Sequence, residues 1–211
     1  MNRYMKPQDI EKRSFEIITA ELGERTFPAG IAEVVKRVIH TTADFDYADS
    51  LAFSPDVIEQ AKAALAAGAT VVTDTNMALS GVSKVTLAKL GGKAVCLMAD
   101  EQVASEAKAR GVTRAVVSME HAAKFEGPLI FAIGNAPTAL IRLHELIEEG
   151  IVAPALVIGV PVGFVNVVEA KELFIGGDTP YIIARGRKGG SNVAASIVNA
   201  LLYQMVHREG F

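Results

Sequence analysis

The stretch Leu129-Ile130-Phe131-Ala132-Ile133-Gly134-Asn135-Ala136-Pro137 decides the fold class of this chain. Its first five residues are all apolar, which predicts a strand that is buried on both faces. Pro137 then begins an amphipathic run that we expect to be helical as far as Glu149. A buried strand that passes directly into a helix is typical of the crossover unit of a parallel sheet.

The same alternation recurs on both sides of this unit. We expect further strands at Thr70–Asp74, Lys93–Met98, Arg114–Ser118, Ala155–Val160 and Tyr181–Ala184, with helices at Glu101–Arg110 and from Val193 to about His207. Short apolar strands that alternate with helices predict a doubly wound α/β fold with a mainly parallel sheet. Ligands of such folds bind beyond the carboxyl ends of the strands.

Three predicted helices precede this alternation. They cover Pro7–Glu21, the run from Pro28 to about His40, and a run from Pro55 to about Ala67 with Ser54 as its N-cap. We expect them to form an N-terminal helical extension that packs on the sheet or reaches across it. The chain has 211 residues and no visible linker, so residues 1–211 are predicted to be a single domain.

Composition narrows the compartment and the partners. The net charge of -3 and the pI near 5.8 argue against a nucleic-acid partner. Cys96 is the single cysteine and lies in an apolar run, which favours a buried thiol and a reducing cytoplasm. The N-terminus does not resemble a signal peptide, and the apolar stretch Ala153–Val168 is too short and broken for a bilayer, so we expect no membrane partner.

His40 is the candidate proton-transfer group, because imidazole exchanges a proton near neutral pH. Arg37 lies three residues earlier on the same helix and would lower the pKa of His40, whereas Asp44 or Asp46 would raise it. The sequence leaves open which of these influences prevails. It also leaves open an ordinary role for His40 as a helix cap or a packed surface residue.

The second candidate is the basic loop, which we define as Arg185-Gly186-Arg187-Lys188-Gly189-Gly190-Ser191. Its cations and glycines, followed by a helix start, suit either an anion cradle or a solvated basic turn. It does not have the spacing of a phosphate-binding P-loop, and Gly159–Phe164 does not have the glycine spacing of a dinucleotide site. The four histidines, His40, His121, His144 and His207, are not spaced like metal ligands.

Several segments together resemble the precorrin-8X methylmutase family, which includes the cobalt-precorrin-8 methylmutases. The matching segments are Ile10–Phe15, Arg37–His40, Asp44–Asp49, Ala132–Leu140, Pro161–Val165 and Arg185–Ser191, and the likeness extends over essentially the whole chain. It implies a flavodoxin-like sheet and a homodimer with active sites near the interface. It also implies an isomerase of cobalamin biosynthesis that moves a methyl group from carbon 11 to carbon 12 of a corrinoid. No cofactor is implied, since cobalt would enter only as part of the substrate.

The resemblance also implies roles for individual residues. His40 would donate a proton to the ring system, and the tetrapyrrole substrate would contact Ser14, Arg37, Ser83 and Arg114. We add the expectation that Arg185, Arg187, Lys188, Gly189 and Ser191 bind the acetate and propionate carboxylates of this substrate. Two alternatives remain: an enzyme that binds a nucleotide or phosphate at the basic loop, and a corrinoid carrier without catalytic activity.

Overall fold

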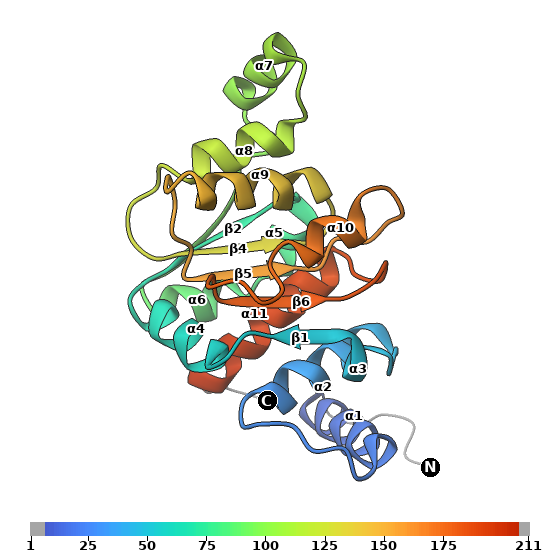
Figure 1. The fold of residues 1–211 in the computed structure, drawn as a ribbon. Coiled ribbons are helices and arrows are strands. Elements are labelled where there is room, and N and C mark those ends of the chain that lie inside the picture. The colour runs from blue at the N-terminus through green and yellow to red at the C-terminus, as the bar shows by residue number, and fades with distance from the viewer. Residues whose placement is uncertain (1–6, 207–211) are drawn as a thin grey trace.

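A six-stranded sheet lies between two layers of helices in the computed structural model, which describes residues 7–206 (Figure 1). The strands are β1 (Leu51–Phe53), β2 (Thr70–Thr73), β3 (Lys93–Cys96), β4 (Leu129–Ile133), β5 (Leu156–Gly159) and β6 (Tyr181–Ala184). Their order across the sheet is β1-β6-β5-β4-β2-β3. The five strands from β2 to β6 are parallel to one another, as the sequence predicts.

The order of the parallel strands is that of a flavodoxin-like sheet. Counted along the chain, β3, β2, β4, β5 and β6 follow the order 2-1-3-4-5, so the strand order reverses between β2 and β4. The predicted doubly wound α/β fold is therefore confirmed. The sequence did not predict β1, which pairs antiparallel with β6 and places Leu51 opposite Ala184.

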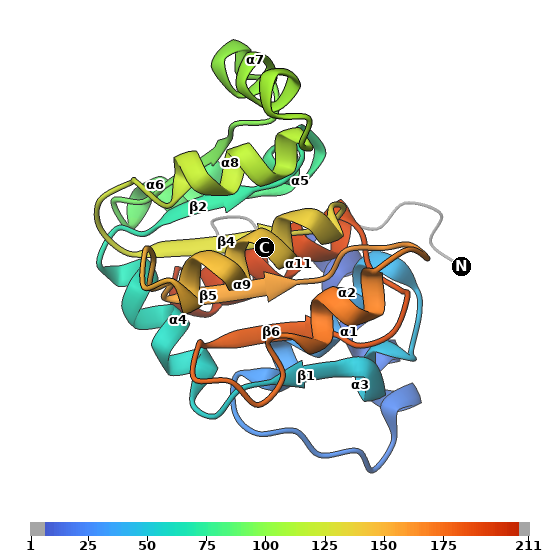
Figure 2. The ribbon, with the colours of Figure 1, turned by 45° about the horizontal axis from the view of Figure 1, so that its top comes forward.

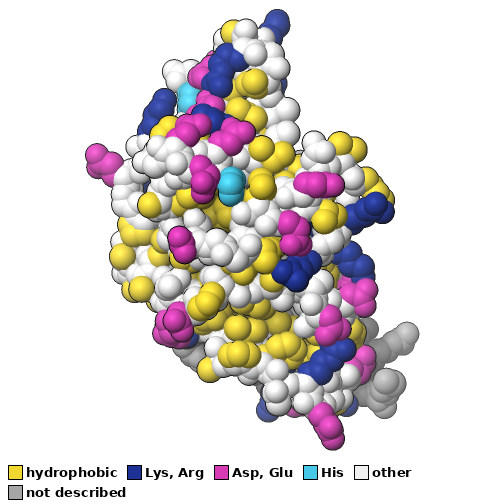
Figure 3. Space-filling view, viewed as in Figure 1, with side chains coloured by type: hydrophobic (Ala, Val, Ile, Leu, Met, Phe, Trp, Pro, Cys, Tyr) yellow, Lys and Arg dark blue, Asp and Glu magenta, His cyan; other side chains and the backbone are white. Residues whose placement is uncertain are grey.

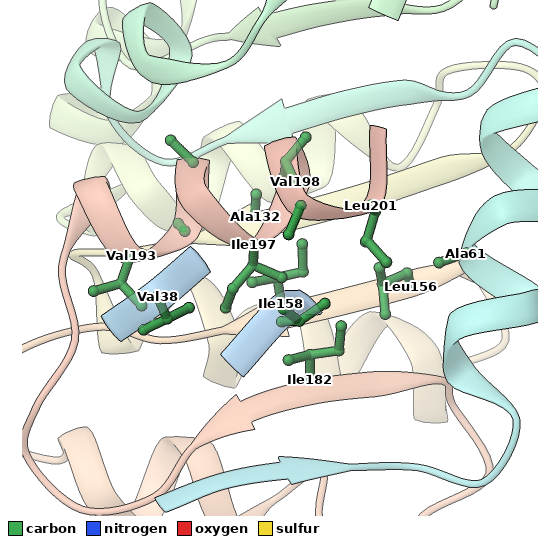
Figure 4. Packing of buried hydrophobic residues seen from close by; sticks show 14 of the residues in the cluster. Val38, Ala61, Ala132, Leu156, Ile158, Ile182, Val193, Ile197, Val198 and Leu201 are labelled. Carbon is green, nitrogen blue, oxygen red and sulfur yellow. The ribbon is translucent and has the colours of Figure 1, made fainter. Parts of the chain in front are cut away.

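Helices cover both faces of the sheet (Figure 2). One layer contains α2 (Ile31–Thr42), α4 (Val57–Ala66), α5 (Asn76–Gly81), α6 (Lys84–Lys89) and α11 (Ser191–Met205), and the other contains α8 (Arg114–Ala122), α9 (Pro137–Glu148) and α10 (Val167–Glu172). Figure 4 shows Ile197 and Val198 of α11 above Ile158 and Ile182 of the sheet, with α2 alongside. The helix α11 is buried along most of its length because α2 packs against it.

The predicted N-terminal extension is present as α1 (Pro7–Leu22), which packs on α2 at one end of the molecule (Figure 1). The second and third predicted helices, α2 and α4, belong to the layer that covers the sheet. The Ile58, Ala61 and Leu65 side chains of α4 are buried in the same core as β4 and β5. The short helix α3 (Tyr47–Ser50) connects the extension to β1.

The prediction of a strand at Arg114–Ser118 is wrong, because this segment begins the helix α8. The hydroxyl of Thr113 caps the helix by accepting a hydrogen bond from Val116 N, and Ala115, Met119 and Ala122 bury one face at helical spacing. A short apolar run cannot by itself distinguish a strand from a buried helix. The helix α7 (Glu101–Arg110) packs on α8 and stands out at one end of the molecule (Figure 1), where charges of both signs gather (Figure 3).

Two helix starts also differ from the prediction. The second helix begins at Ile31 rather than Pro28, because Gly30 adopts a left-handed conformation with φ of 80°. Ser54 does not cap α4; its hydroxyl instead accepts a hydrogen bond from Tyr181 N at 2.9 Å and so joins β1 to β6. His207, the predicted end of the last helix, lies outside the described residues.

A buried carboxylate stabilises the sheet at the point where the strand order reverses. Asp74 follows β2 and accepts hydrogen bonds from the backbone N–H groups of Gly134 at 2.9 Å, Asn135 at 2.8 Å and Ala136 at 2.6 Å. Burial raises the pKa of Asp74, and the three N–H donors act in the opposite direction. This side chain therefore fastens the end of β2 to the turn between β4 and α9.

Replacing Asp74 with Ala should destabilise the fold, because it leaves buried N–H donors without an acceptor. We expect Asp74→Ala to lower the free energy of unfolding by about 3 kcal/mol, and Asp74→Asn, which retains one acceptor oxygen, by less. Urea unfolding followed by circular dichroism measures both values. Asp178→Asn at an exposed loop position is the control and should leave stability unchanged; equal stability of Asp74→Ala and Asp178→Asn would contradict the prediction.

Candidate active site

Loops from distant parts of the chain meet at the carboxyl edge of the sheet. The Thr75 hydroxyl after β2 bonds to the Ser191 hydroxyl at 2.7 Å, and Gly190 N donates to Val160 O after β5 at 2.8 Å. Gly163 N donates to Arg187 O at 3.1 Å. The basic loop therefore lies where the strand pattern places a ligand, between the loops that follow β2 and β5.

Two glycines of this region serve close packing of the backbone. A Cβ atom on Gly189 would collide with the Val160 carbonyl, and one on Gly134 would come within 2.7 Å of Gly190 O. The sequence suggested that the loop glycines bring N–H groups close to a ligand. At Gly189 the immediate requirement is instead the contact with the loop after β5.

Lys188 connects the basic loop to the end of α2. Its Nζ atom lies 2.6 Å from a carboxylate oxygen of Asp44 and 2.6 Å from one of Asp46. These hydrogen bonds raise the pKa of Lys188, and the bond to Lys188 lowers the pKa of Asp44. The two acidic residues considered as partners of His40 thus pair with the basic loop.

The two arginines of the loop have exposed guanidinium groups at the surface. Arg185 Nε lies 3.7 Å from Glu172 Oε1, and the Arg187 guanidinium lies 5.3 Å from the centre of the Phe164 ring. Phe164 is 81% exposed, and Val165 beside it is 77% exposed. Exposed cations next to exposed apolar side chains suit a ligand that has both carboxylates and an apolar surface.

His40 is exposed in the last turn of α2, and its ring stacks on that of Phe15 from α1. The ring centres are 5.3 Å apart and the planes meet at 30°. Partial burial and the nearby Arg37 charge lower the pKa of His40, while Glu11 acts in the opposite direction. Arg37 thus prevails over the acidic residues, a balance that the sequence left open. Ser14 and His40 line the same small cavity of about 200 Å³.

Arg37 is held by α1 and α11. Its Nη2 atom lies 2.6 Å from Glu11 Oε1, and its guanidinium lies 4.7 Å from the Phe15 ring centre and 5.2 Å from that of Tyr203. It lines a groove of about 830 Å³ between the three helices, which is within the range of pockets for small molecules. The groove is lined by Lys12, Phe15, Glu16, Thr19, Ala20, Glu33, Lys36, Arg37, Ala200, Tyr203 and Gln204.

The structure places Ser83 near this region but not Arg114. Ser83 N donates to Asn199 Oδ1 at 2.8 Å, and Asn199 shares a cavity of about 280 Å³ with Arg37. Arg114 lies at the start of α8, with its Nη1 atom 3.4 Å from Met98 O. The cavities lined by His40 and Arg37 do not include Arg114.

Sequence reasoning missed three side chains that hold the candidate site. Glu11 and Phe15 are four residues apart on α1, which places them on one face of that helix, toward Arg37 and His40. The sequence shows this spacing, but it does not show which helix the two side chains face, because the packing of α1 on α2 is a tertiary contact. Tyr203 on α11 had no signal in the sequence beyond its helical position.

The described residues can also be compared with the requirements of a metal site and of a membrane-spanning helix. Within residues 7–206, no three His, Cys, Asp or Glu side chains form a group that could hold a metal ion. None of the helices in this range has the length and apolar character needed to cross a membrane. Cys96 is half-buried rather than buried as expected, because β3 lies at the edge of the sheet.

Comparison with known proteins gives the family. The sequence model of the precorrin-8X methylmutase family matches residues 9–204. The chain belongs to the precorrin-8X methylmutase family. The predicted resemblance is thereby confirmed, and so is the predicted class of enzyme, an isomerase of cobalamin biosynthesis.

Relatives in this family align over nearly their full length. The chain is 46% identical to the cobalt-precorrin-8 methylmutase of Salmonella typhimurium, over 97% of this chain and 99% of the relative. It is 40% identical to the precorrin-8X methylmutase of Pseudomonas aeruginosa, over 92% and 94%. The crystal structure of precorrin-8X methylmutase from Thermus thermophilus superposes with a TM-score of 0.86 at 39% identity, covering 92% of this chain and 94% of that one.

The pKa of His40 should rise when the Arg37 charge is removed. Arg37→Gln deletes a positive charge that disfavours the imidazolium and leaves Glu11 to favour it, so both effects act in the same direction. Arg37→Lys retains the charge and is the matched control. NMR titration of the His40 imidazole measures the pKa, and an equal value in the wild type and Arg37→Gln would show that burial alone sets it.

Gly189→Ala should displace the basic loop from the loop after β5. Relieving the collision with the Val160 carbonyl requires a backbone shift, which we expect to lower the free energy of unfolding by about 1–3 kcal/mol. Gly177→Ala is the control, since its added Cβ would meet only Phe174 O at 3.6 Å. Thermal unfolding of the two variants compares them, and equal melting temperatures would refute the packing role of Gly189.

Proposed function

We propose that this enzyme moves the methyl group of precorrin-8, or of its cobalt form, from carbon 11 to carbon 12, and that His40 donates a proton to the ring system. Protonation of a ring nitrogen or a nearby ring position shifts the conjugation and favours migration. The methyl group is already on the substrate, so the reaction needs no methyl donor or other cofactor. The single observation that carries the proposal is the exposed His40 ring, stacked on Phe15 beside the cavities of α1 and α2.

The lowered pKa of His40 suits a proton donor whose charged form is favoured by the substrate. In the free enzyme, burial and the Arg37 charge lower the pKa of His40 and so disfavour the imidazolium. A tetrapyrrole with many carboxylates brings negative charge to the site, which favours the imidazolium. A donor whose pKa is near the working pH is the most effective general acid.

The remaining roles follow from charge and position. Ser14 and Arg37 contact the substrate near His40, with Ser83 in support, while Arg185, Arg187 and the turn at Gly189 and Ser191 face its carboxylates. Lys188 contributes to that turn through Asp44 and Asp46. Arg114 lies outside the cavities lined by His40 and Arg37, so it would contact only a more distant part of the substrate.

We further propose that the enzyme acts as a homodimer in the cytoplasm, with the active sites near the interface. The helix α1 packs on α2 and presents Ile10, 50% exposed, and Ile17, 44% exposed. Apolar residues on an outer helix suit an interface between subunits. Sedimentation of the purified protein measures its mass in solution.

The alternative of a nucleotide-binding enzyme is disfavoured by Asp74. In a flavodoxin-like sheet, a phosphate would be held at the point where the strand order reverses. Here the amides at the start of α9 already donate to the Asp74 carboxylate. A phosphate would have to displace this buried side chain and would meet its negative charge.

Replacing His40 tests the proposal. His40→Asn retains a polar side chain of similar size but cannot carry the proton, so we expect kcat to fall by about 10²–10⁴-fold with little change in binding of the macrocycle. Turnover is followed by absorbance, and binding by titration with hydrogenobyrinic acid, the proposed cobalt-free product. A corrinoid carrier would show no turnover in the wild type and no effect of the substitution.

His144→Asn is the matched control for this experiment. His144 lies on α9, where its ring contacts the edge of Phe174, away from the cavities of α1 and α2. The control should retain wild-type turnover. Full activity of His40→Asn would refute the proposed proton transfer, and tight binding of ATP with none of the corrinoid would favour the nucleotide alternative.

A further inference from the structure

A buried lysine lies beneath the basic loop. Lys171 on α10 has no exposed surface, and its Nζ atom donates to Gly186 O and to Lys188 O, both at 2.8 Å. Both acceptors are neutral backbone carbonyls of the basic loop. Burial without a counter-ion lowers the pKa of Lys171 to about 8.

The two hydrogen bonds determine which way the peptides of the loop face. In a trans peptide the carbonyl and the following N–H point in opposite directions, and the described residues contain no cis peptide. With Gly186 O and Lys188 O turned toward Lys171, the N–H groups of Arg187 and Gly189 point away from it. The Arg187 carbonyl accepts from Gly163 N, so the N–H of Lys188 points away from Gly163.

The N–H groups of Arg187 and Gly189, which point away from Lys171, are the ones that this arrangement offers to a ligand. In the part of the chain that the structure describes, the N–H groups of Arg187, Lys188 and Gly189 have no acceptor. The exposed side chains of Arg185 and Arg187 belong to the same loop. Backbone N–H groups and guanidinium groups are together the donors that carboxylates prefer.

We propose that Lys171 is a positioning residue for substrate binding: its ammonium group turns the carbonyls of the basic loop inward, so that the loop offers its N–H groups to a carboxylate of the tetrapyrrole. The inference rests on the proposed function, because it takes the carboxylates of that substrate as the ligand. Lys171 itself does not touch the substrate. Burying an ammonium group costs free energy, and an aliphatic side chain at this position would make the fold more stable. The role of Lys171 in orienting the loop accounts for a lysine at this position.

The test compares two substitutions on the same helix. Lys171→Met has a similar length but no donor, and Val167→Ala removes buried volume from α10 while retaining Lys171. Binding of hydrogenobyrinic acid is measured by absorbance titration, and kcat and KM by turnover of the substrate. Urea unfolding measures the stability of each variant, so that effects on binding are compared against loss of stability.

For Lys171→Met we expect Kd and KM to rise by about tenfold or more, the loss of roughly one charge-assisted hydrogen bond, with kcat nearly unchanged. Val167→Ala should keep the Kd of the wild type. Wild-type Kd in Lys171→Met would overturn the inference and leave the proposed function intact. Failure of the wild type to bind the corrinoid would instead overturn the proposed function, and this inference with it.

A measurement on the wild type covers the case in which Lys171→Met does not fold. With lysine labelled at Nζ, the Lys171 ammonium resonance should shift when hydrogenobyrinic acid binds, because a carboxylate on the loop polarises the peptides that Lys171 contacts. Exposed Lys89 on α6 is the internal control and should not shift. Tight binding with an unchanged Lys171 resonance would overturn the inference.

Discussion

The carboxylate of Asp74 is the interaction on which the carboxyl edge of the sheet depends. It is buried where the strand order reverses and ties β2 to the turn after β4. That turn brings Gly134 against Gly190 and Ser191, so the end of the basic loop rests on the structure that Asp74 fixes. In a fold that commonly binds phosphates at this point, the chain supplies its own anion, which agrees with a proposed ligand site that lies toward α2 and the basic loop.

The candidate site is held in place by groups that do not themselves carry the chemistry. Phe15 contacts both His40 and Arg37, Glu11 pairs with Arg37, and Lys171 directs the peptides of the basic loop. Such preorganisation reduces the ordering that substrate binding must supply. The cations of the basic loop differ in their contacts: Lys188 pairs with Asp44 and Asp46, while Arg185 and Arg187 extend to the surface.

The segments that differ from their predicted structure do so because of long-range contacts. Arg114–Ser118 and the strand segments have similar apolar runs, and only the cap at Thr113 and the packing of α8 distinguish them. Ser54 resembles an N-cap, but pairing of β1 with β6 takes its hydroxyl for Tyr181. A local sequence pattern indicates which structures and contacts are open to a residue, and its long-range contacts determine which of these it adopts.

The sequence by itself determined the parallel α/β architecture through its periodicity and the family through its resemblance to known motifs, and it offered His40 and the basic loop as candidates for the site. Periodicity, charge and the order of motifs are properties of the chain alone, so these steps did not need coordinates. Tertiary structure decided which charges meet: Arg37 on Glu11, Lys188 on Asp44 and Asp46, and Lys171 under the loop. These pairings depend on how α1, α2 and α10 pack around the sheet, and packing between segments distant in sequence leaves no local pattern to read.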